Sequence, residues 1–359
     1  MRIVDVRFTS YDLGPLKRPF SNSIIETKRK ELRFVDVVSD EGVVGTAFAS
    51  AHCEAFGPAI RERIVGEDPR NFSRLWHKMF TGWRKPVVKG DAIAAIGAVD
   101  NALWDLRGKI DERPVYQMLG GFSNRVPAYA AGGYYATGKD HSELVDEMCA
   151  YVSAGYRAVK MKVGGAPISV DVARVGRVRE AIGPNVKLMV DANSAWTVAE
   201  AVQFGRAVEH LDLAWFEEPC RPDDIGGMAD LAARVTIPIA GGEVEYTRWG
   251  FRDLIEQRAV AIVQADPQTC GGLTEWMRIA TLASAHHLKM APHGNHYLGA
   301  HALAAVDNGL IVESYAGLHP WQEEFIEGLE FTNGDVVLPD DPGLGMSVDY
   351  DALKNAQTE

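Results

Sequence analysis

Residues 186–217 read VKLMVDANSAWTVAEAVQFGRAVEHLDLAWFE and contain the repeating unit that decides the fold. Two short apolar runs, Val186 to Asp191 and Leu211 to Glu217, flank a stretch from Thr197 to His210 in which apolar residues recur every three or four positions. This pattern predicts a strand, a helix and a second strand. Each predicted strand ends in an acid, Asp191 or Glu217.

The same unit of strand and helix repeats from about Arg125 onward. Further helical patterns cover Ser142 to Ala154 and Gly272 to His286. Alternating buried strands and helices are what a parallel (β/α) barrel requires; a doubly wound sheet would fit as well, but no GxGxxG follows a strand. We therefore expect an α/β protein with a modified (β/α) TIM-type barrel over residues 126–319. Its eight apolar runs are Val126 to Ala131, Arg157 to Val163, Val186 to Asp191, Leu211 to Glu217, Ile237 to Gly241, Ala259 to Asp266, Leu288 to Pro292 and Leu310 to Glu313.

Residues 1–125 follow a different pattern, typical of an α+β domain. Alternating segments predict antiparallel strands, and a long helical pattern runs from Ala92 to Lys109. The tail, residues 320–359, contains a short strand at 334–339 and a turn at 342–345 that we expect to return to this first domain, which would cap the barrel. The predicted strands are Arg2 to Thr9, Glu31 to Ser39 and Val43 to Ala49, with a turn at 40–42.

Length and charge restrict the class of protein. The 359 residues exceed twice the roughly 150 typical of one domain. The net charge of −12 makes nucleic acid and anionic membranes poor partners. No apolar stretch resembles a signal peptide or a membrane span, so we expect a cytoplasmic protein. The scattered cysteines Cys53, Cys149, Cys220 and Cys270 suggest neither disulfides nor a zinc site.

Ionisable residues close seven of the eight predicted strands. The active site of such a barrel lies at the carboxyl ends of its strands, so these side chains should share one mouth. From Lys162 onward each follows the previous one by 20 to 29 residues, close to one strand and helix unit. The series is Lys160 and Lys162, Asp191, Glu217, Glu243, Asp266, His293 and Glu313.

The acids in this series indicate a divalent cation. Burying several carboxylates in one mouth without a metal would cost several kcal/mol per unpaired ion. Asp191, Glu217 and Glu243 come from consecutive strands and offer only hard oxygen ligands, which favours Mg²⁺, with Mn²⁺ as the alternative. Two neighbours compete for these roles. Strand alternation lets only one of Glu217 and Glu218 face the interior, and Glu245 shares its parity with Glu243.

The cationic residues suggest acid and base catalysis. Lys160 and Lys162 project to the same face of a strand, and two close ammonium groups disfavour each other's protonation, which would leave one free to act as a base. His293 follows the strand next to Asp266, an arrangement typical of an oriented acid/base histidine, with His296 as a rival. A proton removed from the carbon α to a carboxylate would leave an enediolate that the metal and a lysine could stabilise.

These residues together resemble the enolase superfamily, and within it the mandelate racemase subgroup, which includes acid-sugar dehydratases. The resemblance implies that Asp191, Glu217 and Glu243 bind the metal, in preference to Glu218 and Glu245. It also implies loops of the capping domain that read the far end of the substrate, and a dimer or octamer. The motifs that carry it are the helix VDNALWDLRGK at 99–109, the lysine pair Lys160 and Lys162, VDAN at 190–193, EEP at 217–219 and GGE at 241–243.

The resemblance assigns the remaining roles residue by residue. Lys160 and Lys162 become the lysine pair of the family, His293 and Asp266 its dyad, and Glu313 its electrophilic acid. Asn193 matches a position that faces the substrate. The capping loop corresponds to Ser21-Asn22-Ser23 and the stretch near His52.

We therefore expect a magnesium-dependent dehydratase whose small-molecule substrate is a sugar acid. It would abstract the proton α to the carboxylate and eliminate the β-hydroxyl through an enediolate, giving a 2-keto-3-deoxy acid. A racemase or epimerase of a 2-hydroxy acid is the alternative, because Lys162 and His293 could serve as two bases on opposite faces of the α-carbon. A non-catalytic metal-binding homologue is disfavoured, because no member of the ring of ionisable residues is missing.

Overall fold

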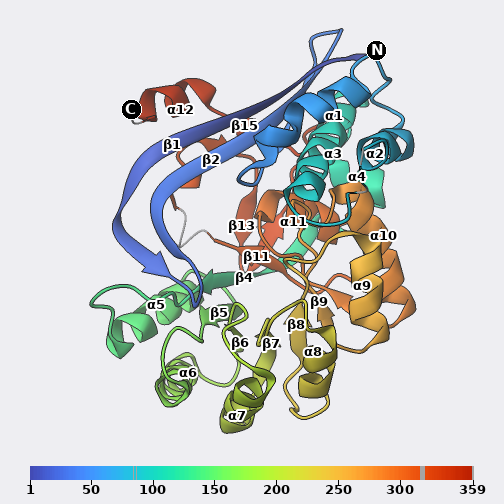
Figure 1. Cartoon of the computed structure of the whole chain (residues 1–359). Coiled ribbons are helices and arrows are strands. Elements are labelled where there is room, and N and C mark those ends of the chain that lie inside the picture. Colours follow the sequence, from blue (N-terminus) through green and yellow to red (C-terminus); the bar gives the residue numbers. More distant parts are fainter. Residues whose placement is uncertain (84, 86, 316–319, 358–359) are drawn as a thin grey trace.

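The computed structural model describes residues 1–83, 85, 87–315 and 320–357. Figure 1 shows two parts, with the N-terminal strands and helices packed above a ring of strands that helices surround. Residue 319, where the barrel was expected to end, lies outside the described residues. In the described part no helix is long and apolar enough to cross a membrane.

The ring of strands is the expected parallel barrel. Hydrogen bonding runs in the order β10, β9, β8, β7, β6, β5, β4, and β11 pairs with the other side of β4. A bridge between Met290 and Gly309 joins β10 to the segment before β11 and closes the ring. The strands are β4 (Arg125–Gly132), β5 (Ala158–Lys162), β6 (Lys187–Asp191), β7 (Leu213–Glu217), β8 (Ile239–Gly241), β9 (Ile262–Val263), β10 (Lys289–Met290) and β11 (Val312–Ser314).

Helices cover the outside of the barrel because each presents one apolar face to the strands. Helix α7 starts sharply, since Thr197 and Glu200 form a capping box in which each side chain accepts a hydrogen bond from the other residue's backbone. The helices are α5 (His141–Ser153), α6 (Ile168–Ile182), α7 (Val198–Val208), α8 (Ile225–Ala232), α9 (Thr247–Glu256), α10 (Leu273–Ala285) and α11 (His296–Leu303), with short 3-10 turns η2 (Glu209–Leu211) and η3 (Pro320–Gln322).

The interior of the barrel is filled with side chains. Tyr129 and Trp215 pack edge to face with their ring centroids 5.3 Å apart, and Met189, Ile262 and Ile311 belong to the same buried cluster. A packed floor of this kind leaves the open mouth, at the carboxyl ends of the strands, as the place for chemistry.

The N-terminal domain is an antiparallel sheet of β1 (Ile3–Ser21), β2 (Glu26–Ser39) and β3 (Val44–Phe48), with η1 (Cys53–Phe56), α1 (Gly57–Ile64), α2 (Phe72–Phe80), α3 (Asp91–Ile110) and α4 (Val115–Leu119). Strands β1 and β2 extend far beyond the predicted Arg2 to Thr9 and Glu31 to Ser39. The outer half of this hairpin is largely solvent-exposed and its register shifts twice, so its sequence shows no clean alternation.

Helix α3 joins the two parts of the molecule. Asn101 Nδ2 donates to Pro267 O at 3.0 Å, and Asn101 Oδ1 accepts from Leu273 N at 2.8 Å. A Cβ on Gly97 would lie 2.8 Å from Gly272 N, so glycine permits the close approach of α3 to the barrel loop. The VDNALWDLRGK stretch is therefore a packed helix whose polar residues hold the domains together.

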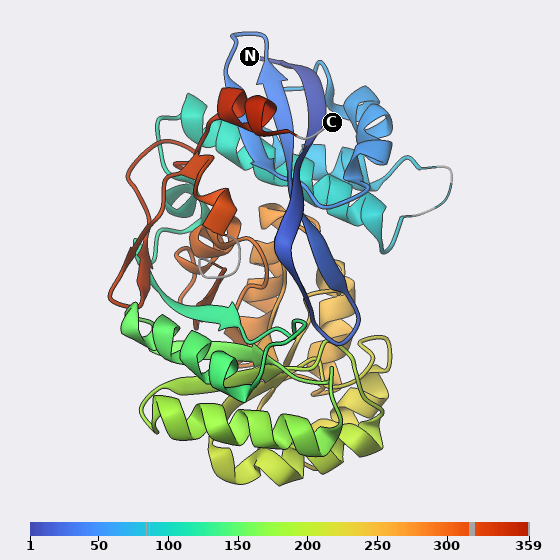
Figure 2. The same ribbon diagram turned by 90° about the vertical axis from the view of Figure 1, so that its left-hand side faces the viewer.

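The tip of the β1–β2 hairpin reaches the mouth of the barrel, as Figures 1 and 2 show. Ser21 and Tyr135 exchange two backbone hydrogen bonds, of 2.8 and 2.9 Å. Ser23 Oγ donates to Ala192 O at 2.7 Å, beside the end of β6. Asn22 Oδ1 accepts from the backbone of Ile24 and Ile25 and so shapes the turn itself.

The C-terminal tail divides between the two parts. Its strand at 335–337 pairs antiparallel with Arg125–Pro127 of β4, in the barrel, rather than with the first domain as predicted. The reason is that β4 begins to pair with β5 only at Ala130, which leaves its earlier backbone groups in need of a partner. The tail elements are β12 (Ile326–Glu327), β13 (Glu330–Thr332), β14 (Asp335–Val337), β15 (Ser347–Val348) and α12 (Tyr350–Ala356).

Other parts of the tail contact the first domain. Leu344 N donates to Asp105 Oδ1 of α3 at 2.8 Å, and Leu353 of α12 packs in a buried cluster with Tyr11 and Phe34. The four cysteines carry no disulfide.

Candidate active site

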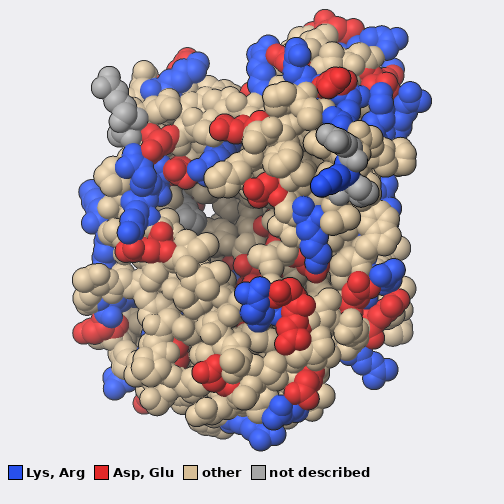
Figure 3. Space-filling model, viewed as in Figure 1, with Lys and Arg blue, Asp and Glu red and all other residues tan. Residues whose placement is uncertain are grey.

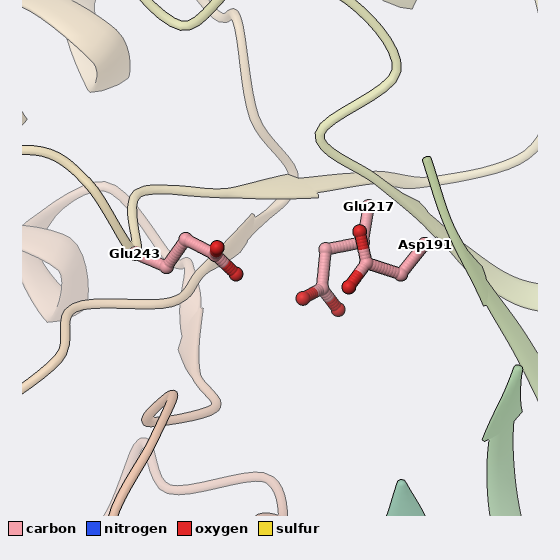
Figure 4. Close-up of side chains that lie close together, drawn as sticks. All are labelled: Asp191, Glu217 and Glu243. Carbon is pink, nitrogen blue, oxygen red and sulfur yellow. The ribbon is translucent and has the colours of Figure 1, made fainter. Parts of the chain in front are cut away.

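Three carboxylates converge at the mouth of the barrel. Asp191 ends β6, Glu217 ends β7, and Glu243 lies just after β8; Asp191 and Glu217 are directly paired between their strands. Figure 4 shows the three side chains pointing toward one another, and one oxygen from each lies within 4.8 Å of the others. On the face shown in Figure 3, a hollow with acidic side chains around it separates the N-terminal part from the barrel.

The residues present fit a divalent cation. Asp191 and Glu217 are fully buried, and such crowded carboxylates repel one another. Burial and the nearby charge of Asp191 raise the pKa of Glu217 to about 8. Burial alone would raise the pKa of Asp191 as well, but Lys162 and Lys160 outweigh it and lower that pKa. An all-oxygen set of this charge is the donor chemistry that Mg²⁺ prefers.

The structure distinguishes the acids of the carboxylate cluster from the neighbouring acids Glu218 and Glu245, which were the alternatives for the same role. Glu245 does not join the three carboxylates but pairs with Lys89, with 2.7 Å between Lys89 Nζ and Glu245 Oε1. Glu218 is buried too, although strand alternation was expected to turn it away from the site. It follows the last residue of β7 and has a φ of 36°, so the alternation no longer applies to it. Burial, and then the charge of Glu243, raise the pKa of Glu218 well above its usual value.

Lys160 and Lys162 lie among these carboxylates. Lys160 Nζ is 2.7 Å from Glu217 Oε1 and 2.8 Å from Glu313 Oε1, and Lys162 Nζ donates to Asp191 Oδ2. Burial alone would lower the pKa of each lysine. The carboxylates outweigh burial, Glu217 most strongly for Lys160 and Asp191 for Lys162, so both pKa values are raised. The repulsion between the two ammonium groups, which was expected to favour a neutral amine, lowers the pKa of Lys162 less than Asp191 raises it, so the expectation was wrong for this arrangement.

His293 bridges acids on both sides of its ring. Its Nδ1 lies 3.0 Å from Asp266 Oδ2, and its Nε2 lies 3.2 Å from Glu243 Oε2. Burial would lower the pKa of His293, but Glu243, Glu313 and Asp266 raise it well above its usual value. An imidazolium at the mouth is a potential proton donor. By contrast, burial lowers the pKa of the rival His296 to about 4.

Glu313 and Asn193 complete the predicted set. Glu313 Oε2 accepts from Gly294 N at 2.9 Å, beside His293. Burial would raise the pKa of Glu313, but Lys160 and His293 outweigh burial and lower it. Asn193 N donates to Asp191 Oδ1 at 2.9 Å, and its buried side-chain oxygen accepts no hydrogen bond from any described residue. A buried acceptor without a partner is what a substrate hydroxyl could satisfy.

Two further residues touch the site without having been predicted. Gln264 Nε2 donates to Glu217 Oε2 at 2.7 Å, and Trp215 Nε1 donates to the same oxygen at 3.0 Å. Both could have been found by parity, since Trp215 lies two residues before Glu217 and Gln264 two before Asp266. His52, near the second predicted capping stretch, lines a cavity of the N-terminal domain with Ser10 and Arg33.

Two family models match this chain. Residues 5–120 match the mandelate racemase / muconate lactonizing enzyme N-terminal domain, and residues 143–352 match the enolase C-terminal domain-like family. Together they cover both the N-terminal domain and the barrel that bears the carboxylates.

Named relatives match over most of their length. An arabinonate dehydratase of Saccharolobus solfataricus is 36% identical over 89% of this chain and 88% of its own. A 3,6-anhydro-alpha-L-galactonate cycloisomerase of Streptomyces coelicolor is also 36% identical, over 82% of this chain and 80% of its own. Among solved structures, a racemase from Streptomyces coelicolor A3(2) with bound magnesium superposes with a TM-score of 0.91 at 31% identity, covering 99% of this chain and 100% of that one.

Proposed function

We propose, since the chain belongs to the mandelate racemase / muconate lactonizing enzyme family of the enolase superfamily, that it is a magnesium-dependent dehydratase of a sugar acid. The observation that carries the proposal is the placement of two proton-transfer groups at the two ends of one carboxylate cluster. Lys162 contacts Asp191 at one end, and His293 contacts Glu243 at the other. A substrate carbon above the cluster would have a proton acceptor on one side and a proton donor on the other.

Asp191, Glu217 and Glu243 would hold the metal. When bound, Mg²⁺ supplies positive charge that stabilises the negative charge developing on the substrate carboxylate. Lys160 is a fixed cation beside Glu217 and Glu313, and would add to that stabilisation. Glu313 is ionised where Lys160 and His293 lower its pKa, so it would have to gain a proton before it could donate a hydrogen bond to the substrate carboxylate.

The chain's residues would then carry out an elimination. The bond between the α-carbon and its hydrogen breaks, and Lys162 or His293 takes the proton, according to the stereochemistry at that carbon. The accepting group must first be neutral, and a cation held by the three carboxylates would offset the negative charge that raises the pKa of Lys162 and His293. The electron pair forms the double bond between the α- and β-carbons as the β-hydroxyl leaves. His293, held by Asp266, gives that hydroxyl a proton and releases it as water. The resulting enol becomes a 2-keto-3-deoxy acid.

A racemase or an epimerase is the second candidate. The same two groups favour it, because Lys162 and His293 at opposite ends of the cluster could serve two faces of one α-carbon. The difference lies in the substrate: elimination needs a hydroxyl on the β-carbon, whereas inversion needs none. The polar tip Ser21-Asn22-Ser23 beside the mouth suits a polyhydroxylated chain.

A library of acid sugars, incubated with the protein and Mg²⁺ in deuterated water, tests the proposal. We expect at least one substrate to give a 2-keto-3-deoxy acid, detected as its semicarbazone, with deuterium at carbon 3. Starting acid that returns with deuterium at the α-carbon and inverted configuration, with no keto acid anywhere in the library, would replace the dehydratase by the racemase.

A further inference from the structure

One carboxylate oxygen of Glu217 already accepts two hydrogen bonds from side chains of the barrel. Oε2 accepts from Gln264 Nε2 at 2.7 Å and from Trp215 Nε1 at 3.0 Å. A carboxylate oxygen has two lone-pair sites, so these bonds use both. The other oxygen, Oε1, accepts only from Lys160 among the described residues. Glu217 therefore has one saturated oxygen and one with capacity left.

We propose that Gln264 and Trp215 are positioning residues that hold Glu217 as a one-oxygen ligand of the divalent cation. The inference rests on the proposed metal-dependent function. Residues that orient a metal ligand through a hydrogen bond commonly contribute 10- to 100-fold to metal affinity. Here two such residues act on one ligand.

The chemistry of the two donors suits this role. An amide and an indole donate hydrogen bonds without bringing a charge of their own, so neither competes with a cation for Glu217. Lysine at position 264 would instead add a competing cation, and glutamate there would set a second carboxylate against Glu217.

The packing around both donors keeps them in place. Gln264 is fully buried and Trp215 is 2% exposed. The Trp215 ring packs edge to face against Tyr129 in the barrel floor, which fixes the direction of its N–H. Gln264 follows β9, and its backbone N donates to Gly241 O at 2.9 Å, so its side chain starts from a backbone held by the neighbouring strand.

One detail of Gln264 is difficult to explain by packing alone. Its Oε1 atom is buried and accepts no hydrogen bond from any described residue. A buried amide oxygen without a hydrogen bond is energetically unfavourable, and leucine would fill the same space without a polar atom. The bond from Nε2 to Glu217 gives a reason for an amide at this position.

The test measures Mg²⁺ binding directly by isothermal titration calorimetry, on the full chain without substrate. Gln264→Leu keeps the bulk of the side chain and Trp215→Phe keeps a smaller aromatic ring, and each removes the N–H that binds Glu217. We expect Kd for Mg²⁺ to rise 10- to 100-fold in Gln264→Leu and by a smaller factor in Trp215→Phe, whose bond is longer. Circular dichroism of the metal-free protein should stay near that of the wild type, whereas the melting temperature should fall, because each variant removes a hydrogen bond from a buried carboxylate oxygen.

Matched controls separate this role from general damage to the core. Asn308→Leu removes a buried amide that binds Ala280 O and Leu288 O, and Trp276→Phe removes a buried indole N–H that binds Ala265 O. Both should keep the wild-type Kd even where they lower the melting temperature. If Gln264→Leu does not fold, Trp215→Phe decides the question, because Trp276→Phe makes the same change of side chain elsewhere in the core.

The outcomes distinguish this inference from the proposed function. Wild-type protein that binds Mg²⁺, together with both variants at the same Kd, would overturn the positioning role and leave the proposed function intact. Wild-type protein that takes up no Mg²⁺ would overturn both. Weaker binding in Asn308→Leu and Trp276→Phe, equal to that in the test variants, would also count against a specific role.

Discussion

Lys160 Nζ and Glu217 Oε1 lie 2.7 Å apart in the mouth of the barrel, and both side chains are almost completely withdrawn from solvent. The same ammonium is 2.8 Å from Glu313. Lys160 is therefore the counter-ion that Glu217 and Glu313 share, and its removal should lower the stability of the protein as well as its activity.

The first prediction concerns that stability. Lys160→Met leaves Glu217 and Glu313 without their shared cation, and breaking a buried ion pair by removing one partner costs about 3–5 kcal/mol. We expect a loss of this size in the free energy of unfolding of the metal-free protein, measured in urea with a chelator present. Lys354→Met, at an exposed pair with Asp351, should change it by less than about 1 kcal/mol. Equal stability of Lys160→Met and the wild type would show that the ammonium is not the counter-ion.

The second prediction concerns the metal ligand. Glu217→Gln removes a charged oxygen from the cluster while keeping the shape of the side chain. Turnover should be abolished and calorimetric Mg²⁺ binding weakened, with the circular dichroism spectrum unchanged, since the barrel core closes without a metal. Glu245→Gln, which removes the partner of Lys89, is the control and should bind Mg²⁺ normally. Full turnover by chelated, metal-free protein would contradict the site.

The third prediction separates proton abstraction from elimination. His293→Asn removes the proton donor for the leaving hydroxyl, so dehydration should stop, a loss of at least about 100-fold. Exchange of the α-proton with deuterated water should continue for a substrate whose α-hydrogen faces Lys162. Nuclear magnetic resonance of the recovered acid measures that exchange. Dehydration at the wild-type rate would move the role of acid to another residue, with His296 the first to examine.

The fourth prediction concerns pH and the contact between α3 and the barrel. Asp100 is buried and accepts bonds from Thr274 N at 2.8 Å and Thr274 Oγ1 at 2.7 Å. Burial raises its pKa to about 7, against about 4 for an exposed carboxyl. A group whose pKa is higher in the folded than in the unfolded chain favours folding most when protonated, so its contribution declines as pH rises from about 4 to 7.

Asp100→Asn should remove that decline. The difference in unfolding free energy between variant and wild type should move in favour of the variant between pH 4 and 7, and then level off. One pKa unit corresponds to about 1.36 kcal/mol, so the total change amounts to a few kcal/mol. Urea unfolding at several pH values measures it. A difference that is constant with pH would mean that Asp100 is ionised throughout.

The barrel and its ring of ionisable residues could be predicted because both follow from short-range patterns. Each buried strand is a short apolar run. A polar residue at its carboxyl end lies at the mouth of the barrel, and this can be recognised without knowing any contact to distant parts of the chain. The choice between Glu243 and Glu245 could not be made from parity. It depends on Lys89, which lies on the other domain and binds Glu245.

Other features depend on distant contacts. The outer half of the β1–β2 hairpin is exposed and has no apolar pattern, yet it is held by backbone bonds between Ser21 and Tyr135. The expectation that one of the two lysines would be neutral failed for a similar reason. The sequence places Lys162 two residues from Lys160, whereas Glu217, whose carboxylate lies 2.7 Å from the ammonium of Lys160, is 57 residues along the chain.

The pairing of β14 with β4 also bears on the order in which the chain is made. The first strand of the barrel, near residue 126, receives one of its partners only when residues near 336 have been synthesised. Asp105 of α3 likewise receives its hydrogen bond from the backbone of Leu344 only after that residue has been synthesised. Neither the N-terminal domain nor the barrel can therefore complete its hydrogen bonds until residues 335–344 have been synthesised. Removal of the segment that begins at Asp335 would consequently damage both parts of the protein, and increased protease sensitivity in each part of the shortened chain would reveal it.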